Sequence, residues 1–209
     1  MLKEFRERYP ECDPVLTVGD TAEVLAMLRE YRVAMGVVGE LSGVRDGEFV
    51  STQIAADELR LSTGAAHPLR TVEEIEPAHL REVTLLARER GSSTRAGADR
   101  LLGDLAVHFR RVVEVASAEA IKEAVIADLG VAVLSSWATR REEEQGLLYP
   151  VADRRLRMAR RFYMVRRADR TLRGAAEAFW SAAARLEVMP STPAAARRRA
   201  SSGESTVQT

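Results

Sequence analysis

Residues 83–95 have the sequence Val-Thr-Leu-Leu-Ala-Arg-Glu-Arg-Gly-Ser-Ser-Thr-Arg, a short apolar run followed by a turn that carries glycine and three hydroxyl groups. The pattern predicts a strand, a turn and the start of a helix. The first N–H groups of a helix have no partner within it, and the helix dipole is positive at that end. We therefore expect a small anion or polar ligand to bind at Ser92, Ser93 and Thr94.

Strands and helices also alternate before this stretch. Residues 15–18 and 33–38 predict two strands, and the helix between them begins at Asp20. The spacing of Asp20 and Glu23 is typical of a capping box. This β-α-β unit is expected to have a right-handed crossover. Residues 1–9 predict a further helix in front of it.

The alternation continues after residues 83–95. Residues 111–115 predict a strand, and the next helix has Ser117 as its expected N-cap. That helix is expected to end at Gly130 in a left-handed cap. The apolar run 131–134 is typical of a buried parallel strand, and residues 137–145 predict a charged helical region.

A long extended segment at residues 49–63 and a late return strand at residues 158–165 suggest two crossings between two lobes. The sequence therefore predicts an α/β fold in which each lobe is a mostly parallel sheet flanked by helices. The expected boundaries place residues 1–63 with 158–189 in the first lobe, 64–157 in the second, and 190–209 in a disordered tail.

The composition limits the classes of function. Lys and Arg total 31, as do Asp and Glu, so the chain has no net charge with which to bind nucleic acid through phosphate contacts. The single cysteine, Cys12, has no intrachain partner, which favours a reducing compartment. No apolar run approaches the length of a membrane span. We expect a soluble, cytoplasmic protein that does not contact a membrane.

No catalytic or metal-binding constellation is evident in the sequence. The histidines His67, His79 and His108 lack the spacing of metal ligands. The turn at residues 91–93 does not match the nucleophile elbow of a hydrolase, and no Asp and His follow it in the expected order. We therefore expect no metal, no cofactor and no enzymatic activity.

Three helix starts are expected to converge on the cleft between the lobes, because ligands of α/β folds bind where strands end and helices begin. They lie at Asp20 and Thr21, at Ser92–Thr94, and at Ser117. Each of these residues also has a simpler role as a helix cap, and the sequence leaves both roles open. Because Asp20 would repel a carboxylate, the charge of the ligand stays open as well.

Several segments resemble, in order, the effector-binding domain of LysR-type transcriptional regulators, whose fold is like that of the type 2 periplasmic binding proteins. The matching segments are residues 2–10, 19–25, 57–69, 88–95, 117–132 and 161–163. Residues 88–95, for example, resemble the family's Arg-Glu-x-Gly-Ser-x-Thr-Arg turn. Residues 31–37 depart from the family's pattern, because its usual Gly and Asp are replaced.

The resemblance implies a sensor that binds a small-molecule effector between two lobes and thereby regulates transcription. It favours contact of the effector with Ser92, Ser93 and Thr94, and the converging helix starts add Asp20, Thr21 and Ser117 as further candidates for effector contact. It also implies a homo-oligomer that reaches DNA only through a helix-turn-helix head, which this sequence lacks. The alternative is a stand-alone small-molecule binding protein or an enzyme on the same fold.

The family's N-terminal part has no counterpart in this sequence. Members begin with a winged helix-turn-helix domain, a linker helix and a first strand that is central in the first lobe. Loss of that strand would leave the strands expected at residues 15–18 and 33–38 with unpaired edges. Our hypothesis is a start placed too far downstream or a truncated remnant, and reading the DNA upstream of Met1 would distinguish the two.

Overall fold

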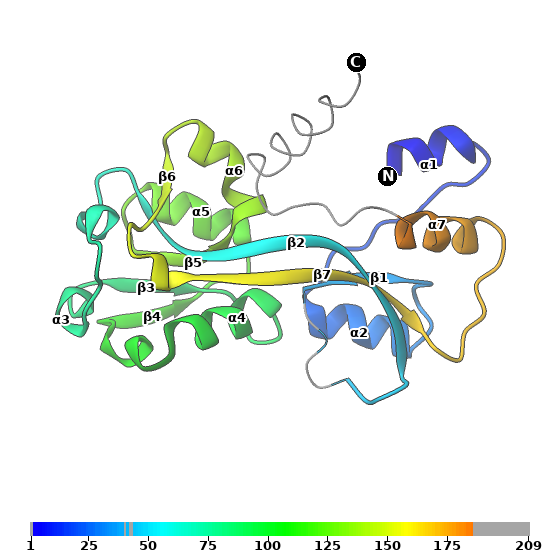
Figure 1. Cartoon of the computed structure of the whole chain (residues 1–209), viewed down its shortest axis with the longest axis horizontal. Helices are drawn as coiled ribbons and strands as arrows, with labels where there is room; N and C mark the ends of the chain where they lie inside the picture. Colours follow the sequence, from blue (N-terminus) through cyan, green and yellow to red (C-terminus); the bar gives the residue numbers. More distant parts are fainter. Residues whose placement is uncertain (1, 40, 42–43, 186–209) are drawn as a thin grey trace, which may run out of the picture. The chain divides into compact units, whose positions relative to one another are not determined.

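The computed structural model describes residues 2–39, 41 and 44–185. They form two compact units, the first from the described residues up to Ala56 and from Arg161 onward, the second from Asp57–Arg160. Two long strands, β2 (Phe49–Gly64) and β7 (Arg157–Arg167), each contribute to both units (Figure 1). The tail expected at residues 190–209 lies outside the described residues.

The first unit is a small sheet covered by helices on both faces. It contains α1 (Leu2–Arg8), α2 (Thr21–Arg29), β1 (Gly36–Val38) and α7 (Ala175–Ala184), with parts of β2 and β7. Strand β1 pairs antiparallel with β7. Val38 and Val165 pack with the apolar residues of α2, whereas Met164 packs with Trp180 of α7. Because neighbouring strand residues point to opposite faces, α2 and α7 cover opposite faces of this sheet.

The strand predicted at residues 15–18 is wrong, because this segment forms neither helix nor strand. Val15 and Val18 are each 91% exposed and Leu16 is 69% exposed. A β-rich composition is not sufficient for a strand, whose backbone N–H and C=O groups require a neighbouring strand as partner. No described strand pairs with residues 15–18.

The second unit contains most of the strand–helix alternation. Its elements are η1 (Pro68–Thr71), α3 (Pro77–Leu80), β3 (Thr84–Ala87), α4 (Ser93–Leu102), η2 (Gly103–His108), β4 (Arg111–Glu114), α5 (Ala118–Ile126), β5 (Ala132–Ser135), α6 (Ser136–Glu144), β6 (Leu148–Pro150) and η3 (Arg154–Leu156). Strand β3 pairs parallel with β4, and Leu85 bridges parallel to Val131 at the start of β5. Strands β5 and β6 pair antiparallel with β2. The strand and helix predicted from residues 83–95 are confirmed as β3 and α4.

Adjacent residues of β3 belong to two different cores. Leu85 packs in a cluster with Leu102 of α4, whereas Leu86 packs in a cluster with Ile121 of α5. Since the two leucines point to opposite faces of the strand, α4 and α5 cover opposite faces of the sheet. The elements alternate and the helices flank the sheets, which is the α/β class that the sequence predicts. The predicted mostly parallel pairing is found for β3 and β4 and for the bridge from Leu85 to Val131, whereas β1 pairs antiparallel with β7, and β5 and β6 pair antiparallel with β2.

Helix α5 ends earlier than the sequence predicts, at Ile126 with Ala127 as its C-cap. The left-handed residue is Asp128, with φ 59°, so the predicted left-handed cap at Gly130 is wrong. Gly130 is required for another reason. A Cβ atom at Gly130 would lie 2.4 Å from the backbone oxygen of Thr84, and the next N–H, that of Val131, donates to the same oxygen at 2.9 Å. The missing side chain thus allows the chain before β5 to approach β3.

We expect Gly130→Ala to destabilise the second unit by about 1–3 kcal/mol, because the added methyl group meets a backbone atom that side-chain rotation cannot move. The measurement is urea unfolding followed by the fluorescence of Trp137 in a Trp180→Phe background, because Trp180 belongs to the first unit. Asp128→Gly is the control and should not lower stability, since glycine adopts a positive φ without strain. Equal stability of Gly130→Ala and the unchanged chain would contradict this account.

Asp153, at the start of η3, joins two loops of the second unit and is 1% exposed. Its carboxylate accepts the backbone N–H of Ile75 at 2.8 Å and that of Arg155 at 2.9 Å. The Arg155 guanidinium donates to the same carboxylate at 2.8 Å. These donors favour the charged form, with the Arg155 side chain first, and lower the pKa of Asp153 to about 2.

Because the pKa of Asp153 is depressed in the folded state, its contribution is present above the ordinary value of 3.8 and is lost as the pH falls toward about 2. We expect the melting temperature of the chain to fall across this window. Asp153→Asn should be less stable at neutral pH and should lose less of its stability on acidification. The exposed Asp104 provides the control, and Asp104→Asn should retain the acid sensitivity of the unchanged chain.

Candidate functional site

Three helices of the second unit begin directly after a strand, and each has a serine N-cap. The Oγ atoms of Ser92, Ser117 and Ser135 accept backbone N–H groups in the first turns of α4, α5 and α6, each at 3.2 Å. The preceding strands β4, β3 and β5 are linked by parallel pairing. Their carboxyl ends therefore lie at one edge, where three positive helix ends favour a polar or anionic ligand.

The first residues of α4 present hydroxyl groups next to an arginine. Arg160 Nη1 donates to Thr94 Oγ1 at 3.0 Å and approaches Ser93 Oγ at 3.5 Å. Both hydroxyl residues are half-buried, whereas the cap Ser92 is only 5% exposed. A hydroxyl oxygen that accepts from arginine keeps its own hydrogen for donation. Thr94, and more weakly Ser93, can therefore donate to an oxygen of a bound ligand.

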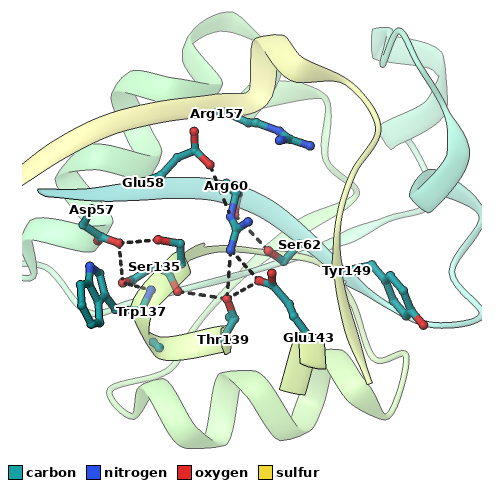
Figure 2. A network of polar contacts seen from close by, with 12 residues as sticks. Asp57, Glu58, Arg60, Ser62, Ser135, Trp137, Thr139, Glu143, Tyr149 and Arg157 are labelled. Atoms are coloured by element: carbon teal, nitrogen blue, oxygen red, sulfur yellow. Dashed lines mark hydrogen bonds and ion pairs between the residues drawn. The ribbon is translucent and has the colours of Figure 1, made fainter. Parts of the chain in front are cut away.

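Arg160 is held in place by a buried acid, Asp57. Arg160 Nε donates to Asp57 Oδ2 at 2.7 Å, and the exposed fractions of the two side chains are 9% and 0%. The hydroxyls of Ser135 and Ser136 both donate to Asp57 Oδ1, each at 3.0 Å, and Figure 2 shows Asp57 facing Ser135. The carboxylate thereby links β2, β7 and the N-terminus of α6. Its buried charge is compensated by one cation and two hydroxyl donors.

A second polar network fixes helix α6 against β2. Arg60 Nη2 donates to Glu143 Oε1 at 2.6 Å, and Thr139 Oγ1 donates to the backbone oxygen of Ser135 at 3.1 Å (Figure 2). Arg60 is 8% exposed and Thr139 is 1% exposed. These contacts restrain the first turn of α6 and hence the two serine hydroxyls that face Asp57.

The described histidines have local structural contacts. Within the part of the chain that the structure describes, the side chains of His67 and His79 accept backbone N–H groups of nearby residues, and His108 ends η2. Burial lowers the pKa of His67. No group of three His, Cys, Asp or Glu residues among the described residues could hold a metal ion.

None of the described helices is long and apolar enough to cross a bilayer.

The structure brings some of the predicted site residues together. Ser92, Ser93 and Thr94 form the start of α4, and the predicted N-cap role of Ser117 is confirmed at the neighbouring helix. The predicted capping box of α2 is also confirmed, because Asp20 and Glu23 accept each other's backbone N–H groups at 2.8 and 2.9 Å. Asp20 and Thr21 belong to the first unit, and their contact with a ligand stays a prediction.

Sequence reasoning missed four residues of the site, Asp57, Ser135, Ser136 and Arg160. The two serines follow an apolar strand and precede a helix, the same pattern that singled out residues 83–95, so this signal could have found them. Asp57 begins the family-like segment 57–69 but has no local pattern that marks it as part of a site, and Arg160 has no signal. Their pairing joins positions 103 residues apart and follows only from the adjacent strands β2 and β7.

We expect the Asp57–Arg160 pair to show strong coupling in a double-mutant cycle. Asp57→Asn and Arg160→Gln should each cost about 3–5 kcal/mol, because each leaves the partner charge buried and unpaired. The double variant should cost less than the sum of the two. The chain has two tryptophans, so a Trp180→Phe background lets the fluorescence of Trp137 report unfolding of the second unit.

The exposed pair Arg110–Glu82 of the second unit serves as the control cycle, with side chains that are 63% and 88% exposed. It should show no coupling beyond experimental error. Additive effects of Asp57→Asn and Arg160→Gln would show that the two side chains do not depend on each other.

Comparisons with known proteins show the family of this chain. The model of the LysR substrate binding domain matches residues 1–186. The HTH-type transcriptional regulator CbbR of Rhizobium meliloti (strain 1021) is 33% identical over 183 residues, which are 86% of this chain and 57% of that protein. The RuBisCO operon transcriptional regulator of Acidithiobacillus ferrooxidans is 29% identical over 197 residues, 92% of this chain and 63% of that protein.

A solved structure shares the fold. The regulatory domain of CcmR from Synechocystis PCC6803, in complex with 2-PG, has a TM-score of 0.80 and 24% identity, and the match covers 90% of each chain. This likeness confirms the predicted α/β fold of the periplasmic-binding-protein type. The chain spans 57–63% of the length of the two curated regulators. It belongs to the LysR substrate-binding domain family.

Proposed function

We propose that this chain is the effector-sensing part of a transcriptional regulator and that it binds a small anion at the N-terminus of α4. The observation that carries the proposal is the position of Arg160, which Asp57 holds with its Nη1 against the hydroxyls of Ser93 and Thr94. The relatives CbbR and the RuBisCO operon regulator, which are transcriptional regulators, support the regulatory role.

The chemistry of the site favours an oxyanion over a neutral or cationic ligand. Two hydroxyl hydrogens and the first-turn N–H groups of α4 other than that of Thr94, which donates to Ser92, are donors, and the helix dipole adds a positive partial charge. The charge of Arg160 is already balanced by Asp57. The anion is therefore held mainly by oriented donors and helix ends, with Arg160 fixing the geometry of the hydroxyls.

The neighbouring CcmR domain gives a first probe, because that protein is in complex with 2-PG. For this chain we propose only the class of ligand, a small acid with oxyanion groups. Contact of the ligand with Asp20 and Thr21 of the first unit, a homo-oligomeric state, a location in the cytoplasm and DNA contact through a separate head belong to the same proposal.

The proposal predicts that 2-PG raises the melting temperature of the purified chain in a concentration-dependent way. A ligand at 100 times its dissociation constant adds about 2.7 kcal/mol to stability. Thr94→Val keeps the shape of the side chain and removes its hydroxyl, so it should abolish most of the shift. Inorganic phosphate, measured in parallel, tests whether an oxyanion alone raises the melting temperature.

Thr71→Val is the matched control, since Thr71 is exposed at η1 of the same unit. This variant should respond to 2-PG like the unchanged chain. A ligand-induced shift that survives Thr94→Val undiminished would place the site elsewhere. If neither 2-PG nor phosphate changes the melting temperature of the unchanged chain, the proposed class of effector is wrong.

A further inference from the structure

The charges around the first turn of α4 are arranged in ion pairs. Each of three arginines near this turn lies next to a carboxylate. The pairs are Arg88–Glu89, Arg95–Asp99 and Arg160–Asp57, with N–O distances of 2.6, 3.0 and 2.7 Å. Arg90, in the same turn, is exposed, so solvent and salt screen its charge. A ligand at Ser93 and Thr94 therefore meets oriented donors, while the three shielded positive charges near it are already compensated.

The Arg160–Asp57 pair contacts these donors directly and is the most deeply buried of the three. Arg160 Nη1 donates to Thr94 Oγ1 at 3.0 Å, so a single guanidinium group separates the Asp57 carboxylate from this hydroxyl. The Asp57 side chain is 0% exposed, compared with 19% for Glu89 and 62% for Asp99. Burial reduces the screening of a charge by water. Of the three carboxylates, Asp57 therefore acts most strongly on a bound anion.

The negative charge of Asp57 weakens the binding of every anion at this site. Two charges roughly 10 Å apart, at an effective dielectric constant of about 20, interact with an energy that changes a dissociation constant about tenfold. Arg160 attracts the anion to a similar degree, so the two effects offset each other. A chloride ion then receives no net electrostatic compensation for the hydration it loses. A small acid with two oxyanion groups accepts more of the oriented donors at once, and these charge-assisted hydrogen bonds replace its hydration.

We propose that Asp57 determines the specificity of the anion site. By cancelling the charge of Arg160, it makes the site select a ligand by the number and placement of its oxygen acceptors and not by charge alone. Small acids with two oxyanion groups bind, whereas simple anions such as chloride do not compete effectively. This inference rests on the proposed function and adds to it the exclusion of simple anions, in which specificity is obtained by weakening the wrong complexes.

A purely structural role for Asp57 predicts a different result. Asp57 also accepts the hydroxyls of Ser135 and Ser136 and thereby holds the start of α6. If that were its whole contribution, Asp57→Asn would loosen the site and weaken the binding of every ligand. If Asp57 sets specificity, the same substitution leaves the charge of Arg160 uncompensated, and anions bind more tightly as its new counter-ions. The two roles therefore differ in the sign of the change in affinity.

The experiment measures the dissociation constant of 2-PG by isothermal titration calorimetry at about 0.05 and about 0.5 M NaCl. Sucrose is present throughout, because it favours the folded state of destabilised variants. In the unchanged chain, the added chloride should weaken binding by less than about threefold. At the lower salt concentration, Asp57→Asn should bind 2-PG about tenfold more tightly than the unchanged chain. At the higher concentration it should lose at least about tenfold, because chloride then competes for Arg160.

Asp99→Asn is the matched control, because it removes the carboxylate of another arginine pair in α4 whose acid is 62% exposed. It should change the affinity for 2-PG and its salt dependence by less than about twofold. The double variant Asp57→Asn/Arg160→Gln restores the charge balance without restoring the original contacts. Its loss of affinity between the two salt concentrations should again be less than about threefold.

Three outcomes would overturn the inference when 2-PG binds to the unchanged chain. They are a loss of about tenfold or more in the unchanged chain on addition of chloride, equal or weaker binding of 2-PG by Asp57→Asn at low salt, and a double variant as sensitive to chloride as Asp57→Asn. The first outcome needs no variant, so the test stands even where Asp57→Asn does not fold. If 2-PG does not bind to the unchanged chain at all, the proposed class of effector fails instead.

Discussion

The Asp57 carboxylate is the constraint on which the geometry of the candidate site in the second unit depends. A fully buried acid cannot stay ionised without partners, and Asp57 obtains them from three separate elements. Arg160 comes from β7, Ser135 ends β5, and Ser136 begins α6. Because these partners are required, β7 and α6 have fixed positions beside β2. Arg160 then reaches the hydroxyls of α4, so one buried charge orients the donors of two helix N-termini.

Local signals were sufficient to predict most of the elements. The cap hydrogen bonds of Asp20, Ser92 and Ser117 join residues two or three positions apart. A short stretch of sequence therefore contains both partners of each bond. Predictions failed where the deciding partner lies elsewhere. Residues 15–18 have the composition of a strand but no strand beside them, and Gly130 is required by the backbone of Thr84 instead of by a helix end.

The same distinction applies to the site. Its hydroxyls could be predicted, because a serine or threonine after an apolar run and before a helix is a short-range pattern. The ion pair could not be predicted. Asp57 begins a family-like segment, but nothing near it in the sequence indicates a partner, and Arg160 is one of several arginines in β7. Only the strand order, with β7 beside β2, brings the two charges to 2.7 Å.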